Sequence, residues 1–501
     1  MRLAELSAAL PAGARIAGGG EEREIVDIAF DSRLAGPGAL FFCVRGSSAD
    51  GHDFAPAVVA AGAVALVVER ELDIDVPQLV VADARRAMGP IAARFFGEPS
   101  TELLMIGVTG TNGKTTTAFL LRAIIEAAGT SCGLLGTVKR IVGGRDEEVE
   151  RTTPEAIDLQ RTLRRMLDAG DRACVMEVSS HALALGRADA IDFDVAAFTN
   201  LTQDHLDFHA DMDDYFAAKR LLFEPGDRGR APGAAAVNVD DPYGRRLVAD
   251  LRGAPPRLTT FSAAGHLADL TAHNVAFDAT GATFTLHGSG PPRDVKLGLP
   301  GHFNVENALA ALAAAFAVDV GIDDAVAALA AAEPVPGRME PVDIGQGFGV
   351  LVDYAHTPDS LENVLAAARR LTRGRLICAF GCGGDRDAAK RPLMGKAGAE
   401  LADLAIVTSD NPRSEDPEAI IEQILAGVPA DRRGAVEVET DRRAAIALAI
   451  GRATPGDLVV IAGKGHEQGQ ELAGGRKVPF DDREVAREQL AALAAAGEGS
   501  S

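Results

Sequence analysis

The chain has 501 residues, which is too long for one hydrophobic core, so we expect two to four domains. It carries 50 Lys and Arg against 72 Asp and Glu, a formal charge of −22, and this balance argues against a broad nucleic-acid-binding surface. The best candidate for a membrane span, residues 308–318, is too short, and the first residues lack the pattern of a secretion signal. We therefore expect a cytoplasmic protein that binds neither nucleic acid nor membrane.

The first two segments of the chain are predicted to be α/β domains, at residues 1–102 and 103–335. Apolar strands in the first alternate with Ala-rich helical patterns, at 40–44, 64–68 and 79–81. The second opens with an apolar strand, a glycine-rich loop and a helix, which is typical of a nucleotide-binding domain. Its predicted elements are strands at 103–108, 173–178, 195–199 and 235–239, a helix at 115–128, and a β-rich excursion at 270–286 that turns at Thr280-Gly281.

A linker is predicted at residues 333–337 (EPVPG), because two prolines and a glycine end a helix. Strands and helices then alternate, which predicts a doubly wound parallel sheet in residues 336–501. The predicted strands are 349–354, 376–380, 404–408, 436–438 and 458–461, and the predicted helices are 358–371, 387–401, 418–425 and 442–452. No internal repeat is visible, and the last eight residues are expected to fray.

The strongest local motif is the loop at residues 107–116 (GVTGTNGKTT). Its glycines let backbone N–H groups approach phosphates, Lys114 supplies a positive charge, and Thr115 offers a hydroxyl to Mg²⁺. Val108 stands where the strict phosphate-loop pattern has glycine, so this is a variant loop, and a simple tight turn is the alternative. The loop indicates ATP or GTP, but a kinase, a motor, a switch and a ligase all remain open.

Two later strands end in polar residues. Glu177 follows one strand, at the edge where open α/β sheets bind ligands, although a neighbouring N–H could equally satisfy it. His205 and His209 follow the next strand, and their spacing on a helix would resemble a metal-binding pair. A zinc hydrolase is therefore an alternative, but one imidazole beside an oxygen-bound Mg²⁺ fits a phosphate loop better. The five cysteines are scattered, and we expect buried reduced thiols.

Nine segments in this order resemble the Mur ligase superfamily, and the similarity runs from residues 30–33 to Glu467. The segments are GTNGKTT (110–116), EVSSH (177–181), TNLTQDHLDFH (199–209), GHFNVENALAA (301–311), PGRME (336–340), DYAHTPDSL (353–361), GCGGDRD (381–387), DNPR (410–413) and GKGHE (463–467). Each is modest evidence alone, and nine in sequence are strong. The resemblance implies an α/β protein of three domains: a UDP-substrate-binding domain at 1–102, a central ATP-binding domain at 103–335, and a Rossmann-like, amino-acid-binding domain at 336–501.

The resemblance also implies roles for individual residues. Positions matching the family's ATP site are Gly110, Thr111, Asn112, Gly113, Lys114, Thr115, Thr116, Asn304, Arg338 and Asp353. Positions matching the UDP-dipeptide site are Phe30, Ser32, Ser47, Ser48, Ala49, Thr152, Thr153, Ser179 and Arg187. Positions matching a diaminopimelate site are Arg386, Asp410, Asn411, Pro412, Arg413, Gly463 and Glu467. Catalytic positions are Lys114, Lys219, Glu177 and His205, and the metal set is Thr115, Glu177, His205 and Lys219 as a CO₂-derived carbamate.

The activity implied is an ATP-dependent, Mg²⁺-requiring ligase that adds meso-diaminopimelate to UDP-N-acetylmuramoyl-L-Ala-D-Glu through an acyl phosphate, for peptidoglycan precursors. We expect a monomer whose partners are these small molecules. Arg413 would grip the carboxylate that distinguishes diaminopimelate from lysine, although DNPR alone could be an ordinary turn. Arg151 and Leu185 depart from the family pattern, and both lie near positions that match the muramoyl-peptide site. A lysine-adding or folyl-polyglutamate ligase, and a nucleotide switch without ligase chemistry, remain alternatives.

Overall fold

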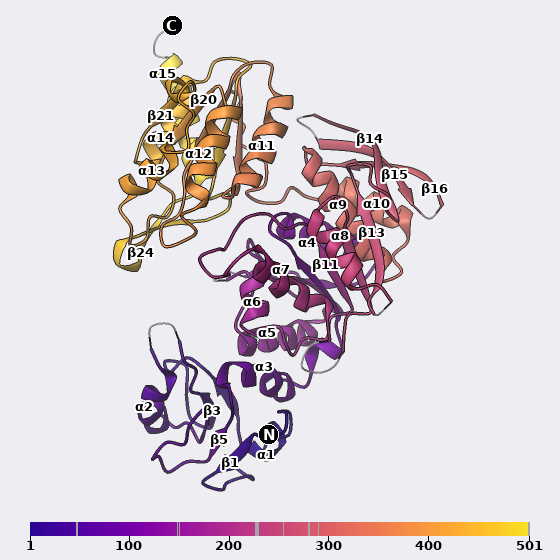
Figure 1. Cartoon of the computed structure of the whole chain (residues 1–501), viewed down its shortest axis with the longest axis vertical. Coiled ribbons are helices and arrows are strands. Elements are labelled where there is room, and N and C mark those ends of the chain that lie inside the picture. The colour runs from indigo at the N-terminus through magenta and orange to yellow at the C-terminus, as the bar shows by residue number, and fades with distance from the viewer. Residues whose placement is uncertain are drawn as a thin grey trace.

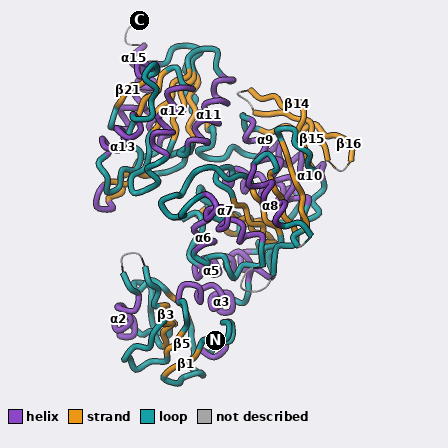
Figure 2. The backbone as a smooth tube through the Cα atoms, in the orientation of Figure 1, coloured by secondary structure: helices purple, strands orange, loops and turns teal. Residues whose placement is uncertain are grey.

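The computed structural model describes residues 1–46, 49–147, 149, 151–225, 230–253, 255–278, 281–288 and 290–498. Three α/β bodies follow one another in chain order, with the two termini at opposite ends of the molecule (Figure 1). Figure 2 shows that each body has its own sheet with helices around it. The predicted fold class of three α/β domains is therefore confirmed. Ser47, Ser48 and the predicted turn residue Thr280 lie outside the described residues.

The N-terminal body has a five-stranded sheet in the order β1-β5-β4-β3-β2. Strands β2 to β5 are parallel, and β1 is antiparallel to β5. Its elements are α1 (Leu3–Ser7), β1 (Arg15–Ala17), β2 (Asp27–Ala29), β3 (Ala39–Phe42), α2 (Ala55–Ala60), β4 (Ala65–Val68), β5 (Gln78–Val80) and α3 (Ala84–Phe95). The three predicted strands correspond to β3, β4 and β5.

The central body is built on an eleven-stranded sheet, in the order β16-β15-β14-β13-β12-β11-β6-β10-β7-β8-β9. Its elements are β6 (Leu104–Thr109), α4 (Lys114–Ala127), β7 (Cys132–Leu135), β8 (Arg140–Val142), β9 (Arg145–Glu147), α5 (Ala156–Ala169), β10 (Ala173–Glu177), α6 (Ser180–Ala184), β11 (Val195–Phe198), α7 (Met212–Arg220), β12 (Ala234–Asn238), α8 (Pro242–Asp250), β13 (Arg257–Ser262), β14 (Leu270–Asp278), β15 (Gly281–Gly288), β16 (Gly290–Leu297), α9 (His302–Phe316) and α10 (Ile322–Ala331). The middle strands are parallel, and hairpins extend the sheet at both ends.

Strand β6 shows how the central sheet is covered on both faces. Ile106 and Val108 pack with α4, α9 and α10, while Met105 packs with α5 to α8 on the opposite face. This alternation follows from the two-residue period of a strand. Because both faces are buried, the functional side chains are confined to the ends of the parallel strands.

The C-terminal body has a six-stranded sheet in the order β17-β18-β22-β19-β20-β21, in which only β17 is antiparallel. Its elements are β17 (Glu340–Pro341), β18 (Gly349–Asp353), α11 (Pro358–Leu371), β19 (Leu376–Phe380), α12 (Lys390–Leu401), β20 (Leu404–Val407), α13 (Pro417–Leu425), β21 (Val436–Val438), α14 (Arg442–Arg452), β22 (Leu458–Ala462), β23 (Gly469–Leu472), β24 (Arg476–Pro479) and α15 (Asp482–Glu498). Helices α11 to α13 cover one face, and α14 and α15 cover the other. The predicted doubly wound parallel sheet is confirmed.

One smaller expectation is also confirmed, because all five cysteines are free and buried. The predicted linker, residues 333–337, forms neither helix nor strand and follows α10, which ends at Ala331. Within the described residues, no helix is both long and apolar enough to cross a membrane.

Candidate active site

The phosphate loop lies between β6 and α4, as predicted, and its glycines are required by the local geometry. Gly110 and Gly113 have φ angles of +150° and +85°, and a Cβ on either would collide with Thr199 or Asn307. Gly113 directly precedes α4, so the N-terminal end of the helix dipole faces the loop. This arrangement is the one that binds phosphate in α/β nucleotide sites.

Two lysine side chains converge on one carbonyl oxygen of this loop. Lys114 Nζ donates to the carbonyls of Gly110 and Thr111 at 3.0 and 2.8 Å, and Lys219 Nζ donates to the Gly110 carbonyl at 2.7 Å. Lys219 is 1% exposed and lies 4.5 Å from the ring centre of Tyr215, whose hydroxyl is 3.2 Å from Thr111 Oγ1. Burial lowers the pKa of Lys114, and burial together with nearby Lys114 holds the pKa of Lys219 well below its usual value. Lys219 is therefore a buried amine at the phosphate loop and not a solvated surface lysine.

Glu177 lies at the end of β10 beside the phosphate loop and is fully buried. Its Oε2 accepts a hydrogen bond from Thr115 Oγ1 at 3.0 Å, and its Oε1 accepts one from the Thr137 N–H at 2.8 Å. A backbone N–H does satisfy one oxygen, but the other faces the loop hydroxyl that the sequence assigns to Mg²⁺. The carboxylate and this hydroxyl form an oxygen-rich donor set that suits Mg²⁺.

The alternative of a metal-binding His205–His209 pair on a helix is not supported by the structure. His205 has a φ of +57° and lies in a turn before α7, so the two imidazoles do not share a helix face. His209 is buried and bonds Ser180 Oγ at 2.9 Å, whereas His205 Nε2 lies 3.5 Å from Asp204. Burial lowers the pKa of His205 to about 3, so its imidazole is neutral. In the described part of the chain, no three His, Cys, Asp or Glu side chains cluster as a metal site, and the zinc alternative gains no support.

The C-terminal body contacts the phosphate loop directly. Arg338 donates to Thr115 Oγ1 at 3.1 Å and lies over the Tyr354 ring, and Asn112 Nδ2 donates to Asp359 at 2.7 Å. Asp353 is buried and accepts from the Met339 and Ala355 N–H groups, which fixes the chain around Arg338. Asn304, fully buried on α9, bonds the Pro300 carbonyl and Asn307.

A second polar cluster lies beyond the carboxyl ends of β20 and β22. Lys464 is fully buried and donates to Asn411 Oδ1 at 2.8 Å and Glu467 Oε2 at 2.9 Å, and Asn411 Nδ2 donates to Glu467 at 3.0 Å. Asp410 lies 3.4 Å from Lys464, which holds the pKa of that carboxyl low despite its burial. The cluster gathers charged groups of both signs, as recognition of a zwitterionic amino acid would require.

Arg413 and Arg386 lie near each other at the rim of this cluster. Arg413 has a φ of +50° and donates to Glu471 at 2.7 Å and to the Gly384 carbonyl at 2.8 Å. The Arg413 guanidinium and the Arg386 Cγ both lie close to Gly383, and Arg386 is exposed. Arg413 keeps 25% of its side-chain surface exposed and can therefore reach a ligand carboxylate.

The predicted UDP-dipeptide residues are split between two bodies. Phe30 lines a cavity of about 310 Å³ between β2 and α5, and Ser32 is half-buried nearby, whereas Ala49 is exposed. Thr153 Oγ1 donates to the Glu177 carbonyl and accepts from the Ser179 N–H, and Thr152 contacts Thr137. The structure thus brings Thr152, Thr153 and Ser179 close to Glu177, which in turn bonds Thr115 of the phosphate loop.

The structure explains why an arginine at position 151 is accommodated, because the Glu155 carboxylate forms ion pairs with three guanidinium groups. Arg151, Arg187 and Arg85 lie 2.9, 2.8 and 3.0 Å from its carboxylate. Glu155 is 5% exposed, and Arg85 comes from the N-terminal body. Arg151 therefore joins a charge cluster between two bodies. Leu185 is the C-terminal cap of α6, and nothing in its contacts accounts for the departure there.

Sequence reasoning missed several residues that the fold places at the site. The position of Lys464 between two glycines in GKGHE was a usable sign of a functional residue. Asp204, Asp359 and Lys390 carried no such sign, because the contacts that bring them to the site join the central and C-terminal bodies.

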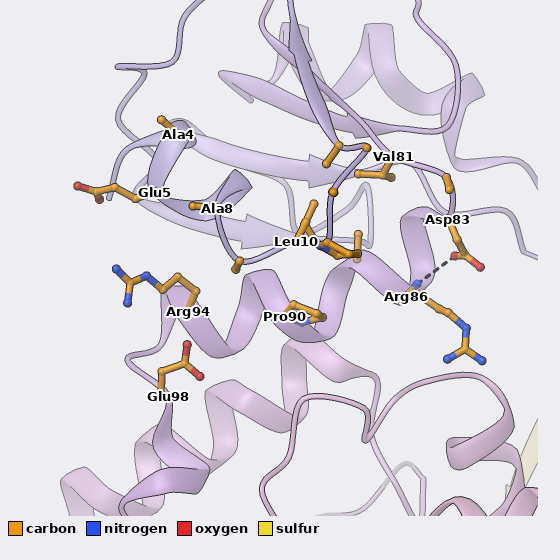
Figure 3. A pocket seen from close by; sticks show the side chains of 17 residues that line it. Ala4, Glu5, Ala8, Leu10, Val81, Asp83, Arg86, Pro90, Arg94 and Glu98 are labelled. Atoms are coloured by element: carbon orange, nitrogen blue, oxygen red, sulfur yellow. Dashed lines mark hydrogen bonds between the residues drawn. The ribbon is translucent and has the colours of Figure 1, made fainter. Parts of the chain in front are cut away.

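A cavity of about 1110 Å³ lies elsewhere, between α1 and α3 of the N-terminal body (Figure 3). Another, of about 780 Å³, lies between the central and C-terminal bodies and has Arg338 in its wall.

These features define the class: a multidomain phosphate-loop protein in which a Rossmann-like body presents a charged cluster to the nucleotide site. The chain also matches three family models, namely "Mur ligase family, catalytic domain" at residues 24–95, "Mur ligase middle domain" at 108–315, and "Mur ligase, glutamate ligase domain" at 337–465. The chain belongs to the Mur ligase family.

Similar proteins cover almost the whole chain. It is 48% identical, over 93% of this chain and 95% of the relative, to the "UDP-N-acetylmuramoyl-L-alanyl-D-glutamate--2,6-diaminopimelate ligase" of Geobacillus kaustophilus. It is 49% identical, over 93% of this chain and 92% of the relative, to the protein of that name from Streptomyces coelicolor. A solved structure bearing the same name matches with a TM-score of 0.68 and 32% identity, covering 99% of both chains. The MurF ligase of Thermotoga maritima in complex with ADP matches in fold, with a TM-score of 0.63 at 18% identity, covering 93% of this chain and 96% of that one.

Proposed function

We propose that the protein is an ATP-dependent amide ligase that joins meso-diaminopimelate to UDP-N-acetylmuramoyl-L-Ala-D-Glu, yielding the tripeptide, ADP and phosphate. One observation carries the proposal: a phosphate loop contacted by Lys114 and the buried Lys219 faces a cluster of acidic and basic side chains on another body, and bonds such as Arg338 to Thr115 join the two. The full-length similarity to ligases named for this reaction supports it.

The chemistry explains why two such sites must meet. A carboxylate is a poor acyl donor, and phosphorylation converts it to an acyl phosphate that an amine attacks, expelling phosphate. The protein has to position the groups and neutralise charge. Lys114 and Arg338, from two different bodies, both contact the loop and are suited to the phosphates. Docking of the two bodies also keeps water from the acyl phosphate.

Glu177, His205 and Thr115 are the proposed residues for Mg²⁺, which supplies charge neutralisation for the phosphates when bound. We further propose that Lys219 carries a carbamate, formed when its neutral amine adds to CO₂ and releases a proton. The lowered pKa of Lys219 favours the neutral amine that this addition needs. A carbamate would give this buried position the oxygen donors that an ammonium lacks.

The proposed amino-acid site combines Asn411, Glu467 and Gly463 with Asp410, Pro412, Arg386 and Arg413. The proposed UDP-dipeptide site combines Phe30, Ser32, Ser47, Ser48 and Ala49 with Thr152, Thr153, Ser179 and Arg187. We place the domain boundaries between residues 102 and 103 and between 335 and 336. We also propose that the protein is monomeric and cytoplasmic.

The first prediction tests the reaction class by phosphate release. Release should require ATP, the UDP-dipeptide and an amino acid together. A nucleotide switch would release phosphate without the amino acid, and a folyl-polyglutamate ligase would ignore the UDP-dipeptide. Lys114→Ala should lower the rate by at least about a hundredfold, because it removes a charge from buried phosphates. Near-normal turnover in a folded Lys114→Ala variant would exclude the proposed role of the loop.

A further inference from the structure

A buried ion pair joins the central and C-terminal bodies. Lys390, the first residue of α12, places its Nζ 3.4 Å from Asp204 Oδ1, in the loop after β11. Both side chains are nearly buried, at 7% and 6% exposed. Among the residues that the structure describes, no carboxylate of the C-terminal body lies within 4 Å of Lys390. The ammonium thus depends on the other body for its counter-charge.

Asp204 is approached from both bodies. His205 Nε2 lies 3.5 Å from it on the central body, and His356 Nε2 lies 3.9 Å from it on the C-terminal body. His356 is oriented by its Nδ1, which is 2.8 Å from the Tyr354 carbonyl oxygen. The Asp204 carboxylate thus lies within 4 Å of three basic side chains, two of which belong to the C-terminal body, and it forms a specific contact between the two bodies.

The energetics make this pair sensitive to domain separation. Burying either charge alone is unfavourable, and the cost is offset only when the partner is in place. If the bodies separated, water would replace each partner, so the pair would contribute only when the bodies are docked. It therefore favours one relative position of the two bodies and contributes little in others.

In this docked position the proposed Mg²⁺ site of the central body and the proposed amino-acid site of the C-terminal body lie next to the same ion pair. Asp204 precedes His205, one of the proposed Mg²⁺ residues, and on the other body Lys390 follows the loop that carries Arg386. Displacement at this contact would therefore move the amino-acid site relative to the phosphate loop. A misplacement of about 1 Å between reacting groups costs roughly a hundredfold in rate.

We propose that Lys390 is a positioning residue for amide formation, whose buried pairing with Asp204 holds the amino-acid site in register with the acyl phosphate. This inference rests on the proposed ligase function. The acyl phosphate has two fates: attack by the amine forms the amide and expels phosphate, whereas attack by water restores the carboxylate and expels the same phosphate. If the amino-acid site is misplaced, attack by the amine becomes slower, whereas attack by water is not blocked.

The experiment compares Lys390→Met, Asp204→Asn, the double variant and Lys390→Arg with the wild type. Lys396→Met is the matched control, because Lys396 is an exposed lysine on the same helix. Two quantities are measured: the rate of tripeptide formation, and the number of ADP molecules released per tripeptide. The second does not depend on the folded fraction, so a variant that merely unfolds leaves it at one.

For Lys390→Met we expect tripeptide formation to fall roughly tenfold to a hundredfold and the ADP-to-tripeptide ratio to rise clearly above one. Asp204→Asn should show the same two changes, and the double variant should be no more impaired than either single variant. Lys390→Arg, which keeps the positive charge, should have an ADP-to-tripeptide ratio closer to one than Lys390→Met. A ratio of one in Lys390→Met would overturn the inference, as would effects of the single variants that multiply in the double variant. A wild type that forms no tripeptide would instead refute the proposed function.

Discussion

At the scale of single residues, the most informative contact is the shared Gly110 carbonyl. Lys114 and Lys219 both donate to it, at 3.0 and 2.7 Å, with little solvent to separate their charges. Two ammonium groups so placed repel each other. Loss of the Lys219 proton relieves this repulsion and leaves a nucleophilic amine at the phosphate loop, near His205.

The second prediction follows for Lys219. Lys219→Ala should lower ligation by at least about a hundredfold, because it removes the proposed oxygen donor. Lys219→Arg should not restore activity, since a guanidinium cannot form a carbamate. A small exogenous carboxylate should partly rescue the alanine variant. Arg220→Ala is the control, because it removes a half-exposed cation from the same helix.

A ¹³CO₂-labelled wild type offers a readout for Lys219 that does not depend on activity. A carbamate carbon signal should be present, and it should be absent from Lys219→Ala. An active Lys219→Ala enzyme, or a fully active wild type without the signal, would contradict the carbamate while leaving the ligase proposal intact.

The third prediction concerns Arg413. If its guanidinium binds the distal carboxylate of diaminopimelate, Arg413→Ala should raise the KM for that amino acid about tenfold to a hundredfold. The KM values for ATP and the UDP-dipeptide should change little. Arg433→Ala removes an exposed arginine of the same body and should change none of the three. An unchanged KM for diaminopimelate in Arg413→Ala would remove Arg413 from the site.

Sequence patterns located residues whose role is local and missed those whose role depends on another body. Lys114 and Glu177 were predictable, because a loop or a strand end fixes each one. Asp204 and Lys390 are 186 positions apart, and no local pattern encodes their pairing. The His205–His209 pair could be kept only as an alternative, because spacing alone does not show that His205 adopts a positive φ.

At the scale of elements, C-terminal segments were predicted well. Helices α11 and α14 and strands β19 and β21 have the predicted bounds, because the apolar residues of each follow the period of a helix or a strand and turn residues flank it. The hairpin β8–β9 was not predicted, since its strands are short and carry charged residues. Helix α5 was overlooked although one of its faces is buried.

The fourth prediction concerns the packing of α14 on α15. Arg442 and Asp482 form a pair that is 1% and 0% exposed, with Nη2 to Oδ2 at 2.6 Å. Asp482→Ala should destabilise this body by about 3–5 kcal/mol, because it leaves a buried guanidinium without its counter-charge. Arg443 and Glu488 join the same helices but are about half exposed, so Glu488→Ala should cost about 1 kcal/mol or less. Thermal unfolding of the two variants measures these losses of stability, and equal losses for Asp482→Ala and Glu488→Ala would contradict the prediction.

At the scale of the whole molecule, the proposed function depends on the docking of the central and C-terminal bodies. Arg338 reaches Thr115, and Asn112 reaches Asp359, so the phosphate loop is completed by side chains from another body. The three-body order was predictable from linker and strand patterns. The contacts between the bodies were not, because they join residues that are distant in sequence.

The most direct test of the central claim is a competition between amino acids. The enzyme is given ATP, UDP-N-acetylmuramoyl-L-Ala-D-Glu and equal concentrations of meso-diaminopimelate and L-lysine, and the products are identified by mass. We predict the diaminopimelate tripeptide with ADP and phosphate, and little lysine product, because a site built around a carboxylate rejects an analogue that leaves its charge unpaired. A predominant lysine tripeptide, or ATP consumption without any amide, would contradict the account.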